Sequence, residues 1–268
     1  MQRIALLVFG VVVYAIFFAT FLYLVAFVGN LQATPLLQSV PALAALVPRS
    51  IDIGGASAPV ALAVLVDLAL ILAFGLQHSV MARTGFKAWL KRRLPPAAER
   101  SVYVLLASVM LMLLFWQWRP IATPLWQAQS VSGMALGWGV FALGFGIVLL
   151  STFLIDHFEL FGLKQVLRNL LGRAEPSPGF VTPFFYRLVR HPLYLGFILA
   201  FWAGPSMTVG HLLFAAAMTA YILVAIRFEE RDLVNQLGAS YEAYRQRVPM
   251  LVPGLPKAAK VEVVAMRG

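Results

Sequence analysis

Long apolar runs set the pattern of this chain. Four of them are close to the ~20 residues that a helix needs to cross the ~30 Å hydrocarbon core of a bilayer. They cover residues 4–28, 59–76, 102–118 and 134–155. The first run is too long for the core of a signal peptide and lacks a small-residue cleavage site, so we expect it to be retained. The pattern predicts four membrane-spanning helices.

A fifth apolar run, residues 196–226, predicts a different element. As one straight helix it would measure roughly 46 Å, which is well beyond the thickness of the bilayer core. The pair Gly204-Pro205 interrupts the run, and proline disrupts the hydrogen bonding of a helix. We therefore expect a helical hairpin with apolar arms over 193–203 and 212–226, whose two polar ends lie on the same side of the membrane.

Polar side chains flank both arms of this hairpin. They are Arg190, His191 and Tyr194 before the first arm, and Glu229, Glu230 and Arg231 after the second. Although the two groups are far apart in the sequence, the hairpin brings them to one membrane surface. This convergence is the candidate site.

Composition places the chain among integral membrane proteins. It is 61% hydrophobic and 12% charged over 268 residues, whereas a soluble domain is roughly 25% charged. The absence of cysteine excludes disulfides and thiolate metal sites. The four histidines are scattered and form no metal-binding motif, so we expect no metal.

The net charge of +10 follows membrane topology. The basic residues lie at the ends of apolar segments and are not interleaved with aromatic residues on a soluble face, so no nucleic-acid partner is expected. With a cytoplasmic N-terminus, only Arg49 and Arg119 of the 21 Lys and Arg fall outside, in agreement with the positive-inside rule. The predicted fold is an all-α, polytopic bundle in the lipid bilayer, with four spans plus a C-terminal hairpin and both termini in the cytoplasm.

The chain is expected to form a single domain. Residues 1–155 hold the four spans, 156–252 hold the candidate site with hairpin 193–226, and 253–268 form a loosely ordered tail. The apolar stretch within the loop 30–58 is too short to span and is expected to lie at the interface or re-enter. Asp67 in the second span is expected to hydrogen-bond a neighbouring helix, and the glycines of the fourth span to permit close helix packing.

Several motifs carry a resemblance to a known family. The segment RHPLYLG, the hairpin, and then EERDL, YEAYR and VP resemble the isoprenylcysteine carboxyl methyltransferase superfamily of membrane-embedded, S-adenosyl-L-methionine-dependent enzymes. Upstream segments such as LQHSVMARTGFK and ERSVYVLLAS are most similar to the bacterial methanethiol S-methyltransferases and to related accessory membrane proteins of nitric-oxide metabolism. The resemblance implies a bacterial inner-membrane protein with its site facing the cytoplasm.

The same resemblance implies contacts with S-adenosyl-L-methionine in the C-terminal half of the chain. The implied residues are Gln165, Phe180, Val181, Tyr186, His191, Pro192, Leu193, Tyr194 and Glu229, and to these we add the charged neighbours Arg190 and Glu230. Taken singly, most of them also fit a structural role as interfacial aromatics or helix-end charges. Their combined order and spacing favours the cofactor.

The acceptor is expected to be a small thiol. One helical turn before Glu229, the prenylcysteine enzymes carry a substrate-contacting Arg, whereas this chain has Ala225. The resemblance then implies methylation of methanethiol to dimethyl sulfide. Methylation of a lipid, amine or carboxylate, and a non-catalytic accessory role, remain alternatives.

Methylation of a thiol requires the thiolate. His157, with Asp156 beside it, is the first candidate for the base, and His78 is the second. A helix-end His157 bonded to the backbone is an equal alternative. The positive sulfonium can also lower the pKa of the thiol, which would leave proximity and orientation as the main catalytic effects.

Overall fold

The computed structural model describes residues 1–174 and 182–254. Within these ranges, five helices are long and apolar enough to cross a membrane. They are α1 (Gln2–Val28), α4 (Val60–Ala82), α6 (Glu99–Gln117), α7 (Val131–Ile155) and α11 (Val209–Leu237). A sixth apolar helix, α10 (Pro192–Trp202), is shorter. The predicted polytopic membrane bundle of four spans plus a hairpin is confirmed.

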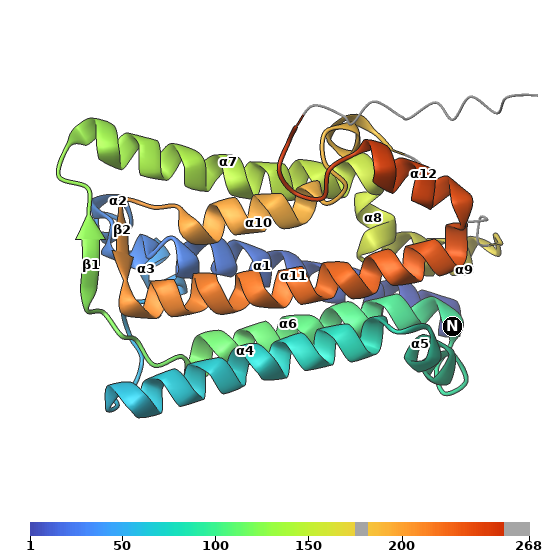
Figure 1. Ribbon diagram of the computed structural model, residues 1–268. Helices are drawn as coiled ribbons and strands as arrows, with labels where there is room; N and C mark the ends of the chain where they lie inside the picture. Colours follow the sequence, from blue (N-terminus) through green and yellow to red (C-terminus); the bar gives the residue numbers. More distant parts are fainter. Residues whose placement is uncertain (175–181, 255–268) are drawn as a thin grey trace, which may run out of the picture.

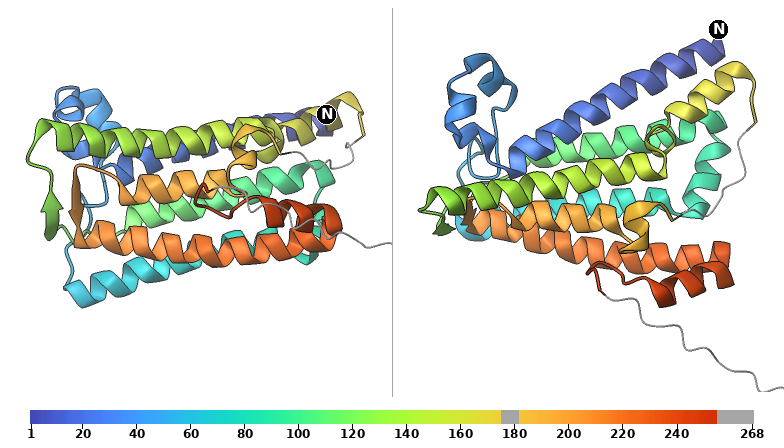
Figure 2. Two further views of the ribbon diagram at one scale, coloured as in Figure 1. Left: turned by 45° about the horizontal axis from the view of Figure 1, so that its top comes forward. Right: turned by 90° about the horizontal axis from the view of Figure 1, so that it is seen from above.

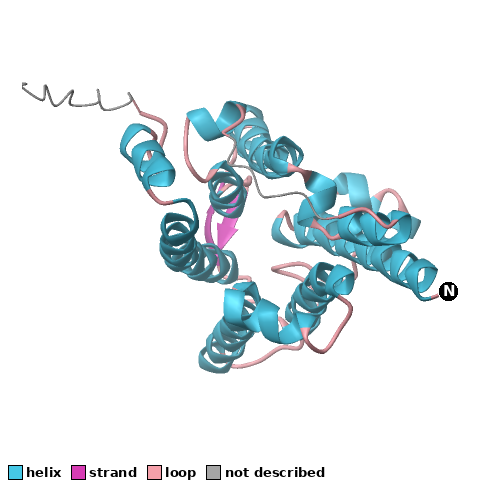
Figure 3. Cartoon of the chain, turned by 90° about the vertical axis from the view of Figure 1, so that its right-hand side faces the viewer, coloured by secondary structure: helices cyan, strands magenta, loops and turns pink. Residues whose placement is uncertain are grey.

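The long helices lie side by side, and short elements gather at the two ends of the bundle (Figures 1 and 2). At one end, on the right in Figure 1 and facing the viewer in Figure 3, lies the N-terminus together with several short helices. They are α5 (Thr84–Lys91), η2 (Pro96–Ala98), α8 (His157–Leu160), α9 (Leu163–Leu171), η3 (Phe184–Arg187) and α12 (Ala239–Arg247). We call this the polar end, and the opposite end the far end.

The far end is closed by a loop and a small sheet. Strand β1 (Pro124–Gln127) pairs antiparallel with β2 (Ser206–Thr208). The loop after α1 holds η1 (Leu31–Ala33), α2 (Pro35–Gln38) and α3 (Pro41–Leu46), none of which is long enough to span. The indole of Trp118 donates to the carbonyl of Ile51 at 3.0 Å, which fixes this loop against the core.

The predicted hairpin turns at Gly204, whose φ of +143° favours glycine. Helix α10 has 11 residues and is only about 16 Å long. Helix α11 has 29 residues, so the predicted arm 212–226 is too short at both ends. It starts earlier because the Thr208 hydroxyl caps it by accepting the amide of His211 at 3.1 Å, and it continues past Glu230 without a break.

Helices α7 and α10 pack through small residues. A Cβ added to Gly144 would lie 2.6 Å from the amide nitrogen of Ala200, and one added to Gly196 would lie 2.6 Å from the carbonyl oxygen of Gly144. The prediction of close packing is therefore confirmed for Gly144. It fails for Gly139 and Gly146, where a Cβ would meet nothing within 4 Å.

Asp67 is fully buried in α4. Its Oδ1 accepts the backbone amide of Arg119, just beyond α6, at 2.9 Å. The expected hydrogen bond is present, but its partner is the chain after the helix. Because Arg119 follows the far end of α6, Asp67 lies away from the polar end.

Candidate functional site

The two polar ends of the hairpin meet as predicted. The hydroxyl of Tyr194, in the first turn of α10, donates to Oε2 of Glu229 in α11 at 2.9 Å. Proline at the first position of α10, Pro192, has the φ that a helix start requires, and Leu193 follows it within the same turn. Residues far apart in sequence thus form one polar cluster at the end of the membrane helices.

Glu230, the neighbour of Glu229, binds two residues that precede α10. Its Oε1 accepts Nε of Arg190 at 2.7 Å and lies 3.0 Å from Nε2 of His191. The side chains of Arg190 and Glu230 are only 10% and 13% exposed, so water screens this ion pair weakly. Arg231, the third charge predicted here, instead lies over the ring of Phe228.

Arg190 also holds the segment that follows α12. Its Nη1 donates to the carbonyls of Val248 at 2.6 Å and Arg245 at 3.1 Å, and its amide donates to the carbonyl of Pro249 at 2.9 Å. The hydroxyl of Tyr244 donates to the carbonyl of Tyr186 at 2.5 Å. The motifs YEAYR and VP therefore lie against the start of α10.

Glu229 differs in its ion pairing from the other buried or partly buried carboxylates of the polar end. Among the described residues, five such carboxylates each lie within 4.0 Å of a basic side chain: Glu99, Asp156, Glu159, Glu230 and Asp232. Glu229 has no such ion pair in the described chain, and its hydrogen bond from Tyr194 neutralises none of its charge. A half-buried carboxylate without a cation is suited to a positively charged ligand.

Aromatic hydroxyls surround this carboxylate. Tyr103 and Tyr186 are both close enough to interact electrostatically with Glu229. Burial, followed by the negative charge of Glu229, raises the pKa of Tyr186 and keeps it neutral. Tyr103 was not among the predicted site residues. The sequence indicated Tyr103 only through its position in ERSVYVLLAS, a segment similar to the methanethiol S-methyltransferases.

His78 lies beside the same cluster. Its Nε2 is 2.8 Å from the hydroxyl of Tyr103, and its ring stacks on Phe74. Its Nδ1 is buried and has no hydrogen-bond partner among the described residues. Since a buried unpaired nitrogen costs about 1–3 kcal/mol, this atom is suited to a ligand or to a proton.

His157 has both ring nitrogens occupied. Nε2 lies 2.8 Å from the hydroxyl of Tyr14, and Nδ1 lies 2.8 Å from that of Thr152. The Thr152 hydroxyl donates to the carbonyl of Leu149, so Nδ1 must be the donor and Nε2 accepts from Tyr14. With 3% of its surface exposed and its ring stacked on Phe153 at 4.2 Å, His157 is suited to hold α1, α7 and α8 together. Its partners are side chains, however, and not the backbone expected from the sequence.

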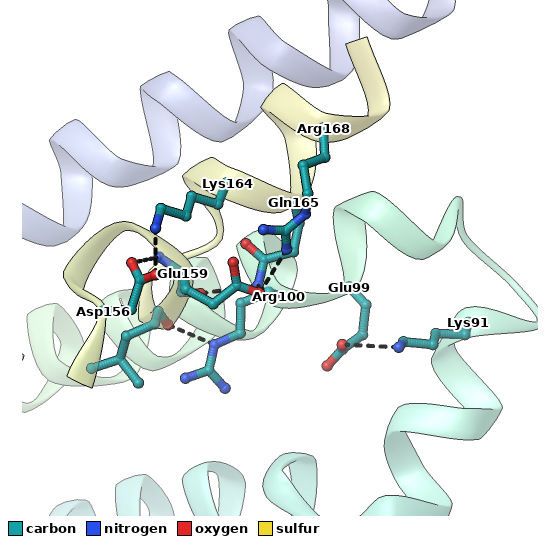
Figure 4. Close-up of polar contacts among 9 residues, drawn as sticks. Lys91, Glu99, Arg100, Asp156, Glu159, Lys164, Gln165 and Arg168 are labelled. Atoms are coloured by element: carbon teal, nitrogen blue, oxygen red, sulfur yellow. Dashed lines mark hydrogen bonds and ion pairs between the residues drawn. The ribbon is translucent and has the colours of Figure 1, made fainter. Parts of the chain in front are cut away.

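Asp156 and Gln165 belong to a second polar cluster around α8 and α9 (Figure 4). Asp156 caps α8 by accepting the amide of Glu159 at 3.1 Å, and it pairs with Lys164. Burial opposes ionisation of Asp156, but the bonds from Lys164 and Glu159 outweigh it and lower its pKa. The amide of Gln165 donates to Oε1 of Glu159 at 3.0 Å, and its own oxygen is buried with no hydrogen-bond partner among the described residues.

Phe180 and Val181 lie outside the described residues. In the part of the chain that is described, no three His, Asp or Glu side chains come together as metal ligands.

Replacing His157 by alanine is expected to destabilise the fold. The change leaves a cavity and deprives Tyr14 and Thr152 of their partners, which typically costs about 2–4 kcal/mol. Thermal unfolding in detergent measures this loss. Slow turnover with an unchanged unfolding midpoint would instead favour His157 as the base.

The stability carried by His157 also depends on pH. Burial lowers the pKa of His157 from its ordinary value of 6.5, while the charge of Asp156 opposes the shift. Below that value the unfolded chain binds the extra proton and the folded chain does not, so stability falls as the pH falls. The variant His157→Gln is expected to lose less stability than the wild type between about pH 7.5 and 5.5.

Fold and site together define a class: multi-pass helical membrane proteins with a polar, aromatic-lined site at one end of the bundle. The chain belongs to the NnrU protein family, whose model matches residues 66–258.

Among its relatives are proteins named methanethiol S-methyltransferase. The chain is 52% identical over 253 residues to methanethiol S-methyltransferase 2 of Bradyrhizobium diazoefficiens, covering 94% of this chain and 92% of that one. It is 47% identical to the methanethiol S-methyltransferase of Mycobacterium tuberculosis, covering 94% and 98%. Nurim of Sus scrofa is more distant, with 33% identity over 177 residues, 62% of this chain and 66% of that one. No solved structure matches the chain. The resemblance noted from the motifs is confirmed.

Proposed function

We propose that this protein transfers a methyl group from S-adenosyl-L-methionine to a small thiol, with methanethiol as acceptor and dimethyl sulfide as product. The observation that carries the proposal is the carboxylate of Glu229, which is held by Tyr194 where the two hairpin ends meet and has no ion pair within the described residues. The names of relatives that are 47% and 52% identical over most of the chain give independent support.

The residues of the site fit this cofactor. When bound, S-adenosylmethionine supplies a methyl group activated by a sulfonium. Glu229 offers a negative charge to a cationic ligand, and the rings of Tyr103, Tyr186 and Tyr194 offer aromatic surface near it. Gln165 holds a buried carbonyl oxygen with no hydrogen-bond partner among the described residues, which suits an amino group of a ligand.

The acceptor side requires a thiolate and a place for its proton. In the overall reaction the thiol sulfur forms a bond to the methyl carbon, the sulfonium carbon–sulfur bond breaks, and the thiol proton is released. We propose Nδ1 of His78 as the acceptor of this proton, because it has no hydrogen-bond partner among the described residues, whereas both nitrogens of His157 are bonded. Ala225, one turn before Glu229 in α11, has a small apolar side chain, which supports a small apolar acceptor.

The proposed location is a bacterial inner membrane, with the polar end in the cytoplasm. The clustering of short basic segments at the polar end supports this orientation through the positive-inside rule.

Two measurements on detergent-purified protein test the proposal. Calorimetry with S-adenosylhomocysteine is expected to show binding, and headspace gas chromatography after addition of methanethiol and S-adenosylmethionine is expected to show dimethyl sulfide. Without binding, the proposal fails and a non-catalytic accessory role is favoured. Binding without dimethyl sulfide would exclude methanethiol and favour a lipid, amine or carboxylate acceptor.

A further inference from the structure

Two of the partly buried basic side chains of the polar end have no ion pair within the described residues. Six lysines and arginines are partly buried at this end: Arg83, Lys87, Arg100, Lys164, Arg168 and Arg190. Four of the six form ion pairs: Arg83 with Asp232, Lys164 with Asp156, Arg168 with Glu159, and Arg190 with Glu230. Within residues 1–174 and 182–254, Lys87 and Arg100 have no carboxylate within 4.0 Å.

Arg100 is fixed in place without being neutralised. Its Nε donates to the carbonyl of Leu160 at 2.6 Å, and its guanidinium carbon lies 5.0 Å from the centre of the Tyr103 ring. Figure 4 shows its terminal nitrogens pointing away from the carboxylates of Asp156 and Glu159. Two donor groups are thus presented in a held orientation, which suits the bidentate binding of a carboxylate.

Lys87 increases the positive charge at the same place. Burial, followed by repulsion from Arg100, lowers the pKa of Lys87, while the charges of Glu99 and Asp232 oppose the shift. An anion bound between two like charges relieves their repulsion.

Tyr103 connects this positive pair to the negative side of the candidate site. Arg100 lies over its ring, and the charge of Glu229 also acts on its hydroxyl. The charges of Arg100 and Glu229 thus both act on Tyr103, and within the described residues the two form no ion pair with each other. A positive and a negative side chain that are held apart suit a zwitterionic ligand, in which an ammonium and a carboxylate are attached to one carbon.

We propose that Arg100, with Lys87 beside it, binds the carboxylate at the amino-acid end of the methyl donor, while Glu229 binds the ammonium of the same end. This assignment rests on the proposed function. It places the amino-acid end of the ligand between α6 and α11 at Tyr103, and it makes Arg100 a ligand-binding residue that the hairpin motifs do not contain.

The experiment compares two thioether nucleosides that differ in the amino-acid end. S-Adenosylhomocysteine carries the ammonium and carboxylate, and 5′-methylthioadenosine lacks both. In calorimetry on the purified full chain, Arg100→Gln is expected to weaken binding of S-adenosylhomocysteine roughly 30-fold, as expected for loss of a charge-assisted contact. Its affinity for 5′-methylthioadenosine is expected to stay within about twofold of the wild type.

Two further variants separate charge from structure. Arg93→Gln removes the same charge from an exposed side chain of the same end and should leave both affinities unchanged. Arg100→Lys keeps the charge but loses the fork that reaches Leu160, so it should recover only part of the lost affinity for S-adenosylhomocysteine.

Three outcomes would overturn the assignment: wild-type affinity for S-adenosylhomocysteine in Arg100→Gln, an equal loss for both nucleosides, or no recovery in Arg100→Lys. If the wild-type protein bound neither nucleoside, the proposed function itself would fail. Failure of the assignment alone gives a different result: the wild-type protein binds both nucleosides, and Arg100→Gln binds them with the same affinities.

Discussion

Replacing Glu229 by glutamine is expected to weaken binding of S-adenosylhomocysteine roughly 100-fold, since losing one partner of a desolvated charge pair costs about 2–5 kcal/mol. The change keeps the size of the side chain and an oxygen that can accept from Tyr194. It removes only the charge that no basic residue of the described chain balances. Methyl transfer should fall at least as much, and calorimetry and headspace chromatography measure the two losses.

The control for this variant is Glu242→Gln, which removes the same charge from an exposed position in α12. Thermal unfolding of ligand-free Glu229→Gln should match or exceed the wild type, because neutralising an unpaired, half-buried carboxylate removes a desolvation cost. Unchanged affinity in Glu229→Gln would remove the main support for the proposed function.

Replacing Arg190 by alanine is expected to produce the largest loss of stability. Arg190 binds Glu230 in α11 and the carbonyls of Arg245 and Val248, so one side chain connects three segments of the site. Removing one partner of a buried ion pair typically costs about 3–5 kcal/mol, because the other charge remains without compensation. Thermal unfolding, and limited proteolysis of the segment after α12, measure the effect.

A neighbouring arginine provides the comparison. Arg187 is exposed, and its side chain makes a single hydrogen bond within the described residues, 3.3 Å to the carbonyl of Thr182. The variant Arg187→Ala should change stability by no more than about 0.5 kcal/mol. Equal behaviour of the two variants would show that Arg190 does not hold these segments together.

The sequence predicted the membrane spans and the meeting of the hairpin ends because both follow from local rules. Apolar length predicts a span, and Gly204-Pro205 predicts the turn that places Tyr194 next to Glu229. The contact between Arg190 and Glu230 follows from the same geometry.

The remainder of the site depends on packing between elements that no local pattern reports. Sequence spacing does not predict the hydrogen bond between His78 and Tyr103, or the two hydroxyl partners of His157. These contacts join residues of different helices. Arg100 looked like one of many positive-inside charges. It differs from them only in the structure, where four of the six partly buried basic residues of the polar end form ion pairs and Arg100 does not.

Helix α11 runs without interruption from its Thr208 cap to Glu229 and beyond, so the cap and the carboxylate lie about 31 Å apart on one stiff rod. At the cap, the Thr208 hydroxyl donates to Asp52 at 2.6 Å, which anchors this end of the helix. A tilt of about 5° around it would displace Glu229 by about 3 Å. Because membrane helices adjust their tilt to bilayer thickness, the thickness of the surrounding bilayer is expected to change the position of Glu229 and with it the affinity for a ligand bound there.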